Sequence, residues 1–395
     1  MGKKTVKDIE VRDKRVLVRV DFNVPRDKST GEITDDARIR AALPTIQYLI
    51  DQNAKVILCS HLGRPGGEVK KELRLARVSE RLSELLGKPV KCMQDCVGSE
   101  VEKSVGEMQS SDVILLENLR FHAEETKNEP SFARSLANLA EVYVNDAFGT
   151  AHRAHASTAG VADYLPAVSG FLMEKEIEFL GRALADPARP FAMIIGGAKV
   201  GDKISLLENI IEKVDVLIVG GGMANTFIKA QGYTVGNSKV EDDQLEFSRN
   251  LIEKAALKGV RLILPVDGIA AEDFEAESLT RIVSLDDVPD NWMLLDVGPE
   301  SVKRFSEELR GCRTIVWNGP MGVFEFPAFA KGTQAIASLV AELDATTIIG
   351  GGDTAAAVKQ MGVASKMTHV STGGGASLEF MEGKTLPGVA ALMDK

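Results

Sequence analysis

Arginine and histidine side chains recur in the first half of the sequence, close to places where an apolar run ends. Forked guanidinium donors match phosphate and carboxylate oxygens, and imidazole adds a further donor. Each residue alone fits an ordinary surface charge or a hydrogen-bonded histidine. Their shared position at expected strand ends favours an anion-binding pocket, whereas His122 and His155 are interpreted as structural. The candidate anion ligands are Asp21, Asn23, Arg38, His61, Arg64, Arg120 and Arg153.

Glycine clusters follow apolar runs in the second half of the chain. They lie at 196–197, 220–222, 350–352 and 373–375. Glycine lets a backbone approach a phosphate closely, and the helix that follows offers free N–H groups. One such cluster could be a packing device, but four at the ends of expected strands predict a nucleotide site.

Two of these clusters resemble known phosphate motifs without matching them well. The stretch 196–203 begins like a P-loop but has Asp202-Lys203 where Lys-Ser/Thr is required. The stretch 350–355 satisfies G-x-G-x-x-A, although it comes late for a dinucleotide fold. Asp353 would place a carboxylate beside a pyrophosphate, which is favourable only with a metal ion between them. The second half therefore favours a magnesium nucleotide, with an NAD-dependent dehydrogenase as the first rival.

Lys199 and Lys203 lie four residues apart where a helix is expected to begin. Both could reach one phosphate chain. The alternative is a solvated lysine pair, which like-charge repulsion would slightly destabilise.

Short apolar runs bounded by turn residues alternate with helical patterns along the chain, as in buried parallel sheets. Strands are expected at 15–22, 54–61, 113–119 and 142–146, with a helix at about 37–52. In the second half, strands are expected at 191–195 and near 214–219, 260–264, 314–317, 346–349 and 368–371.

The segment 171–185 reads as one amphipathic helix, and the proline-bearing stretch 186–190 ends it. With 395 residues, the chain suits two domains, and this segment would connect them. The alternative is one more helix inside a single large sheet.

Charge and composition limit the classes of partner that the chain is expected to bind. The net charge of −10 arises after residue 170, because residues 1–170 hold 25 basic and 25 acidic side chains. An acidic chain argues against a general nucleic-acid surface. Neither a membrane-length apolar run nor a secretory signal core is present, so a cytoplasmic protein is expected.

The cysteines are interpreted as ordinary reduced thiols. Cys92 and Cys96 could bind a metal ion or form a disulfide, but no second Cys/His pair lies at metal-ligand spacing. The remaining two are Cys59 and Cys312.

Several ordered strings resemble the phosphoglycerate kinase family along essentially the whole chain. In the first half they are RVDFNVP (19–25), SHLGRP (60–65), ENLRF (117–121) and NDAFGTAHRAH (145–155). In the second half they are GGAKV (196–200), WNGPMGVFE (317–325), GGGDT (350–354) and STGGGAS (371–377). No functional motif position departs from the family pattern.

The resemblance implies an α/β protein with two doubly wound, Rossmann-like parallel-sheet domains joined by a helical hinge. Residues 1–170, with 380–395 returning, would bind phosphoglycerate; 171–190 would be the hinge helix and linker; 191–379 would bind the nucleotide. The implied reaction is reversible, Mg²⁺-dependent phosphoryl transfer between 1,3-bisphosphoglycerate with ADP and 3-phosphoglycerate with ATP, direct and after hinge closure. A monomer without nucleic-acid or membrane partners is expected.

The resemblance also implies residue roles. The seven anion ligands above would hold the phosphoglycerate, and Asp353 would hold Mg²⁺. Catalytic roles would fall to Arg38, Lys199, Lys203, Gly351 and Gly374. The nucleotide would be bound by Gly197, Ala198, Lys203, Gly221, Gly222, Leu295, Asn318, Pro320, Val323, Glu325, Gly351, Gly352, Asp353 and Thr354. A second rival is a protein that binds nucleotide without catalysis, which would leave the arginine-rich first half without a purpose.

Overall fold

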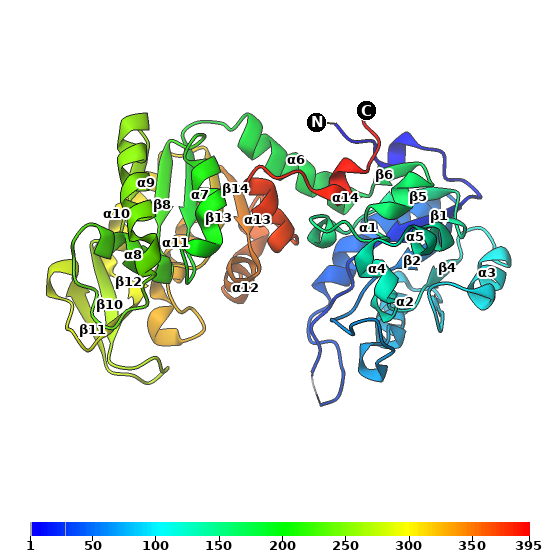
Figure 1. Ribbon diagram of the computed structural model, residues 1–395, viewed down its shortest axis with the longest axis horizontal. Coiled ribbons are helices and arrows are strands. Elements are labelled where there is room, and N and C mark those ends of the chain that lie inside the picture. The colour runs from blue at the N-terminus through cyan, green and yellow to red at the C-terminus, as the bar shows by residue number, and fades with distance from the viewer. Residues whose placement is uncertain (1, 28) are drawn as a thin grey trace. The chain divides into compact units, whose positions relative to one another are not determined.

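The computed structural model describes residues 2–27 and 29–395. The chain divides into two compact units (Figure 1). Unit 1 comprises Met1–Glu178 and Thr385–Lys395, and unit 2 comprises Phe179–Lys384. The helix α6 (Phe171–Ala185), which has the predicted bounds, begins in unit 1 and ends in unit 2.

Unit 1 is built on a six-stranded sheet in the order β3-β4-β2-β1-β5-β6, with every neighbouring pair parallel. Its strands are β1 (Arg15–Arg19), β2 (Lys55–Cys59), β3 (Lys91–Cys92), β4 (Val113–Leu115), β5 (Val142–Asn145) and β6 (Ala167–Ser169). The chain moves to one side from β1 to β2 and to the other side when it reaches β5. Right-handed crossovers therefore put helices on both faces, and a switch point lies beside β1.

The helices of unit 1 pack around this sheet, and the longer ones bury an apolar stripe in the core. In α1, for example, Ile39, Ile46 and Leu49 are fully buried and belong to the same core as Val16 and Val56. These helices are α1 (Ala37–Asp51), α2 (Ala76–Leu86), α3 (Ser99–Gly106), α4 (Ala123–Lys127), α5 (Pro130–Ala137) and α14 (Pro387–Ala390).

The last residues of the chain pack on unit 1. Lys3 Nζ donates to the carbonyl of Leu392 at 2.8 Å. Gly388 approaches so closely that a Cβ there would lie 3.0 Å from the Cα of Ala151. The C-terminal segment therefore supports the loop that follows β5.

Unit 2 has a second six-stranded parallel sheet, in the order β15-β14-β13-β7-β8-β9. Read in chain order, this is the 3-2-1-4-5-6 arrangement of a doubly wound fold, whose switch point lies between β7 and β13. The strands are β7 (Phe191–Ile195), β8 (Val216–Val219), β9 (Arg261–Ile263), β13 (Thr314–Asn318), β14 (Thr346–Gly350) and β15 (His369–Val370). The expected architecture, two doubly wound parallel-sheet domains, is confirmed.

A three-stranded antiparallel sheet, in the order β11-β10-β12, completes unit 2 and is absent from the sequence-based expectations. Its strands are β10 (Asp267–Ala271), β11 (Thr280–Ser284) and β12 (Met293–Val297). The first has an Asp-Gly start and two alanines, all poor strand formers, so its propensity signal is weak.

The helices of unit 2 are α7 (Ile204–Ile210), α8 (Gly221–Ala230), α9 (Leu245–Lys258), α10 (Pro299–Leu309), α11 (Lys331–Val340), α12 (Gly352–Gln360) and α13 (Gly375–Met381). Across the described residues of both units, none of the helices combines the length and apolarity needed to cross a membrane.

Candidate functional site

The predicted anion ligands gather at the carboxyl edge of the unit 1 sheet, where ligands bind in doubly wound folds. Asp21 and Asn23 follow β1, while His61 and Arg64 follow β2. Arg120 lies in the short 3₁₀ helix after β4, and Arg153 lies after β5. Arg38 belongs to the first turn of α1.

Hydrogen bonds join the loops at this edge. Arg38 Nη1 donates to Asp21 Oδ2. The side-chain oxygen of Asn23 accepts from the backbone N–H of Gly63 at 2.9 Å, which ties the β1 loop to the β2 loop. Part of the predicted set is thus structural as well as available to a ligand.

Arg120 is the most informative member of the set. Its side chain is buried, and Nη1 donates to the carbonyl of Gly63 at 2.8 Å. Within the part of the chain that the structure describes, its Nε and Nη2 are buried and have no hydrogen-bond partner. Burial, with Arg19 and Arg153 nearby, lowers the pKa of Arg120 to about 10, so it remains charged at neutral pH. Buried donors of this kind are costly unless a ligand satisfies them.

His61 is buried, and its ring is held in one tautomer. Arg19 Nη2 lies 3.2 Å from His61 Nδ1, and arginine can only donate. Nδ1 must therefore accept, which places the proton on Nε2. Burial, followed by the charges of Arg19, Arg120, Arg38 and Arg153, holds the pKa of His61 well below its usual range. His61 is thus a neutral N–H donor surrounded by cations.

Arg19, Glu125 and Ser157 are functional candidates that the sequence reasoning missed. Arg19 is completely buried and donates from Nε to Ser157 Oγ at 2.8 Å. That hydroxyl donates to Glu125 Oε1 at 2.6 Å, and Glu125 is also completely buried. A cation and an anion are therefore linked through one hydroxyl behind His61. The available signal was a charge inside the apolar run of β1, since buried arginine is rare without a partner.

The other predicted positions differ in their surroundings. Arg64 is exposed, and Arg153 is half-buried with its Nε 3.2 Å from His152 Nε2. His155 is buried, and burial together with Arg120, Arg19 and Arg153 lowers its pKa to about 4. We name Arg19, Arg38, Arg120 and Arg153 around His61 the cationic cluster.

Unit 2 contains a cavity of about 420 Å³ whose lining includes strand-end and sheet residues. The lining contains the predicted Gly197, Ala198, Gly221, Gly222, Leu295, Pro320, Val323, Glu325 and Asp353. It also contains Asn225, Asn237, Lys239, Phe274, Met293, Leu294 and Gly322, which the sequence reasoning did not assign. Most of its wall is apolar, with a few polar groups, as in sites for planar ligands.

Glycine at the switch point allows three loops to meet. Gly221 has φ +65°, and a Cβ there would lie 2.6 Å from the backbone nitrogen of Gly197 and 2.8 Å from the carbonyl of Pro320. A side chain at Gly196 would lie 2.1 Å from that same carbonyl. The loops approach this closely only because Gly196 and Gly221 lack a Cβ, and Gly197, Gly221 and Pro320 line the cavity.

Some predicted nucleotide ligands lie beside the cavity rather than in its wall. Lys203 Nζ donates to Asn318 Oδ1 at 2.5 Å, and burial lowers the pKa of this lysine. Thr354 is buried, and its hydroxyl accepts from Gly319 N–H at 2.6 Å. Asn318 and Thr354 therefore brace the loop after β13.

Lys199 lies in a different setting from the one expected. It is exposed on the loop after β7, and the 3₁₀ helix Gly201–Lys203 and α7 begin only after it. The carboxylate of Glu241 accepts from the N–H of Val200 and, at 3.1 Å, from that of Gly201. This carboxylate holds the loop in place. Lys199 lies on that loop and Lys203 lies in the 3₁₀ helix, so the two lysines do not form a pair on one helix.

Two helix starts at this edge carry the remaining predicted residues. Gly351 precedes α12 with φ +84°, and Gly374 precedes α13 with φ +53°. Gly352 and Asp353 form the first turn of α12 and are exposed. The carboxylate of Asp353 makes no hydrogen bond or ion pair with another described residue, although its charge acts on Lys203.

Comparison with known proteins identifies the chain's relatives. The family model for phosphoglycerate kinase matches residues 6–384. The chain belongs to the phosphoglycerate kinase family. Relatives named phosphoglycerate kinase from Moorella thermoacetica and Pelotomaculum thermopropionicum are 62% and 60% identical over the full length of both chains. The solved phosphoglycerate kinase of Coxiella burnetii shares 44% identity with a TM-score of 0.90, covering 98% of each chain. That of Pyrococcus horikoshii shares 34%, with a TM-score of 0.85, covering 99% of this chain and 98% of the other.

Membership of this family identifies the reaction that the protein catalyses. It is a phosphotransferase with phosphoglycerate kinase activity, and its substrates are ATP or ADP and 3-phosphoglycerate or 1,3-bisphosphoglycerate. The dehydrogenase alternative based on 350–355 is wrong.

Proposed function

We propose that the cationic cluster of unit 1 holds the phosphoglycerate and that the cavity of unit 2 holds the adenine nucleotide. The observation that supports the phosphoglycerate site is Arg120, which has two buried donors without a hydrogen-bond partner among the described residues. A phosphate or carboxylate would satisfy both with the bidentate geometry that guanidinium favours. His61 would add a neutral Nε2–H. Asp21, Asn23, Arg38, Arg64 and Arg153 complete the proposed phosphoglycerate site.

The nucleotide half rests on the cavity at the switch point between β7 and β13. Its glycine floor lets backbone approach a phosphate chain, and its apolar wall suits an adenine. Glu325 lines the cavity and would accept hydrogen bonds from ribose hydroxyls. Lys203 and the N–H groups around Gly351 and Gly374 would meet the phosphates.

Asp353 fits a magnesium ion bound together with a nucleotide. Its carboxylate is exposed and lines the cavity, and Mg²⁺ prefers one or two carboxylates with phosphate oxygens and water. When bound, the ion would neutralise phosphate charge.

The transfer proposed here is direct, with no phosphorylated enzyme. The acceptor is a carboxylate, which is ionised at neutral pH and needs no base. His61 is a poor nucleophile candidate, because Nδ1 accepts from Arg19 and Nε2 carries the proton. Arg38, Lys199 and Lys203 would surround the moving phosphoryl group and stabilise its charge. Labelled ADP mixed with ATP and enzyme, without phosphoglycerate, should show no exchange; rapid exchange would reveal a covalent intermediate.

Hinge closure is proposed to precede transfer, because the phosphoglycerate ligands belong to unit 1 and the nucleotide ligands to unit 2. In-line transfer needs reacting atoms about 3–3.5 Å apart and shielded from water. Small-angle X-ray scattering should show a drop in radius of gyration with both substrates and a smaller change with either one. An unliganded protein as compact as the ternary complex would exclude the closing mechanism.

The remaining proposals concern the protein's setting. A monomer in the cytoplasm, acting in glycolysis and gluconeogenesis without nucleic-acid or membrane partners, agrees with an acidic chain of this composition.

The decisive experiment is a coupled assay with 3-phosphoglycerate and ATP, with and without Mg²⁺. Transfer that requires both substrates and the metal is expected. ATP binding without transfer would support the non-catalytic alternative.

A further inference from the structure

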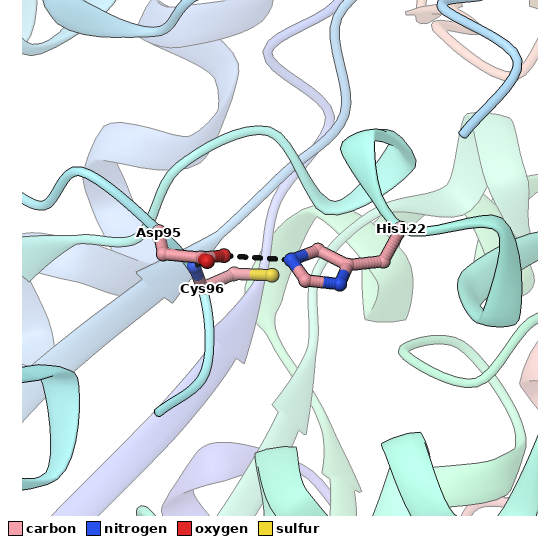
Figure 2. A group of neighbouring side chains, drawn as sticks. All are labelled: Asp95, Cys96 and His122. Atoms are coloured by element: carbon pink, nitrogen blue, oxygen red, sulfur yellow. Dashed lines mark hydrogen bonds and ion pairs between the residues drawn. The ribbon is translucent and has the colours of Figure 1, made fainter. Parts of the chain in front are cut away.

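A second group of polar side chains lies in unit 1 and has no part in the reaction above. Asp95 and Cys96 lie in the loop between β3 and α3, and His122 immediately precedes α4. One carboxylate oxygen, the Cys96 sulfur and an imidazole nitrogen all lie within 4.8 Å of one another. Figure 2 shows the three side chains directed toward a common point.

The geometry points to a binding site for a thiophilic divalent metal ion, for which Zn²⁺ is the best match. Carboxylate, thiolate and imidazole are the ligand types that zinc takes, and three protein ligands leave a fourth position for water. Mg²⁺ is a poor match, because it avoids sulfur ligands.

The spacing is close to what a tetrahedral ion needs. Bonds of about 2.0–2.3 Å place neighbouring ligand atoms roughly 3.4 Å apart. Asp95 Oδ1 lies 2.7 Å from His122 Nε2, so these two atoms must separate by about 0.7 Å and exchange their hydrogen bond for bonds to the metal. The sulfur is already within 4.8 Å of both. A separation of up to 4.8 Å must shorten toward about 3.4 Å when an ion binds.

Neighbouring groups orient the ligands and leave the site open to solvent. The Cys96 N–H donates to Asp95 Oδ1 at 2.6 Å, and the His122 ring stacks on Phe132 with centroids 5.2 Å apart. The side chains of Asp95 and His122 are 54% and 28% exposed, whereas Cys96 is buried. An ion can thus enter from the surface and meet the sulfur beneath.

Binding requires one proton to leave. Burial, followed by the charge of Asp95, raises the pKa of the Cys96 thiol, so the sulfur is protonated when no ion is present. The S–H bond breaks, a metal–sulfur bond forms, and the proton goes to solvent, with no change of oxidation state.

The test uses Co²⁺ alone as a spectroscopic probe, with the full-length protein freed of metal by chelator and kept free of nucleotide. We expect a near-ultraviolet thiolate-to-cobalt charge-transfer band that saturates at about one ion per chain and disappears when Zn²⁺ displaces the weaker-binding cobalt. Cys96→Ser should lose the band. Cys92→Ser is the matched control, four residues earlier on β3, and should keep it. The Asp353 site has no thiol and cannot give this signal.

Two further variants keep the inference testable if Cys96→Ser folds poorly. Asp95→Asn and His122→Asn each remove one ligand at a partly exposed position, and each should weaken cobalt binding about tenfold or more. The absence of a band in the parent would overturn the site. Persistence of the band in Cys96→Ser, or unchanged affinity in both ligand variants, would overturn it as well.

Discussion

Replacement of Arg120 by Met separates the binding role of this residue from its structural cost. The stem of Arg120 packs in the interior, and Met retains an apolar chain of similar length. The substitution removes two buried donors that have no hydrogen-bond partner in the described part of the chain, and it removes the repulsion from Arg19 and Arg153. It also removes the hydrogen bond to the carbonyl of Gly63.

The expected magnitudes have opposite signs for stability and binding. Each unsatisfied buried donor costs about 1–3 kcal/mol, and the lost hydrogen bond contributes about 1 kcal/mol. Relief of both donors, about 2–6 kcal/mol together, exceeds the lost hydrogen bond, so the unliganded variant should be about 1–5 kcal/mol more stable than the parent. Removal of one partner of a buried charge pair costs about 2–5 kcal/mol, so 3-phosphoglycerate should bind about 30-fold to about 5,000-fold more weakly.

Thermal unfolding with and without 3-phosphoglycerate, and calorimetric titration with the same ligand, measure both quantities. Arg12→Met is the control, because Arg12 is an exposed arginine outside the cluster. It should leave ligand affinity and melting temperature unchanged. The reasoning is refuted if Arg120→Met lowers unfolding free energy by more than about 3 kcal/mol, or if its affinity remains within about threefold of the parent.

Three further predictions follow from the same structure. Asp353→Ala should lose activity about 10²–10⁴-fold through weaker metal binding; activity within about threefold at saturating Mg²⁺ would remove Asp353 from the site. Arg38→Ala should lower kcat by the factor that corresponds to about 2–4 kcal/mol of lost transition-state stabilisation, whereas Arg64→Ala should mainly raise KM. The same kinetic pattern in both variants would contradict this division of roles. Burial raises the pKa of Asp146 to about 6. The unfolded chain therefore loses this proton at lower pH than the folded protein, and the free energy of unfolding should decrease by on the order of 3 kcal/mol as the pH rises from about 4 to about 6. Asp146→Asn should therefore raise the melting temperature more at pH 8 than at pH 4, and a gain independent of pH would contradict the assignment.

The strand-end residues were predictable because two simple regularities coincide. Parallel strands appear in sequence as short apolar runs, and their carboxyl ends meet at one edge of the sheet. His61 and Arg120 are far apart in the chain, yet both stand just after such runs. The same reasoning located Gly197 and Gly221 at the carboxyl ends of strands.

Other parts of the site depend on packing that a linear pattern does not express. Met293 lines the unit 2 cavity from β12, and Phe274 lines it from the loop after β10, a strand of weak propensity. Glu125 lies on a short helix, and only the fold brings it to Ser157. Cys96 and His122 have no motif spacing, because their meeting depends on the loops around β4.

The cationic cluster also shows how a fold can keep positive charge available for a ligand. Glu125 is completely buried and is linked to Arg19 through the Ser157 hydroxyl, which accepts a hydrogen bond from Arg19 Nε and donates one to the Glu125 carboxylate. The anion thus reduces the cost of burying Arg19 while leaving Nη2 to fix the His61 tautomer. Among the described residues, Arg120 donates to one carbonyl, and its Nε and Nη2 donate to no group. An anionic ligand can then gain both charge neutralisation and hydrogen bonds, and the energy stored in unsatisfied donors is recovered when it binds.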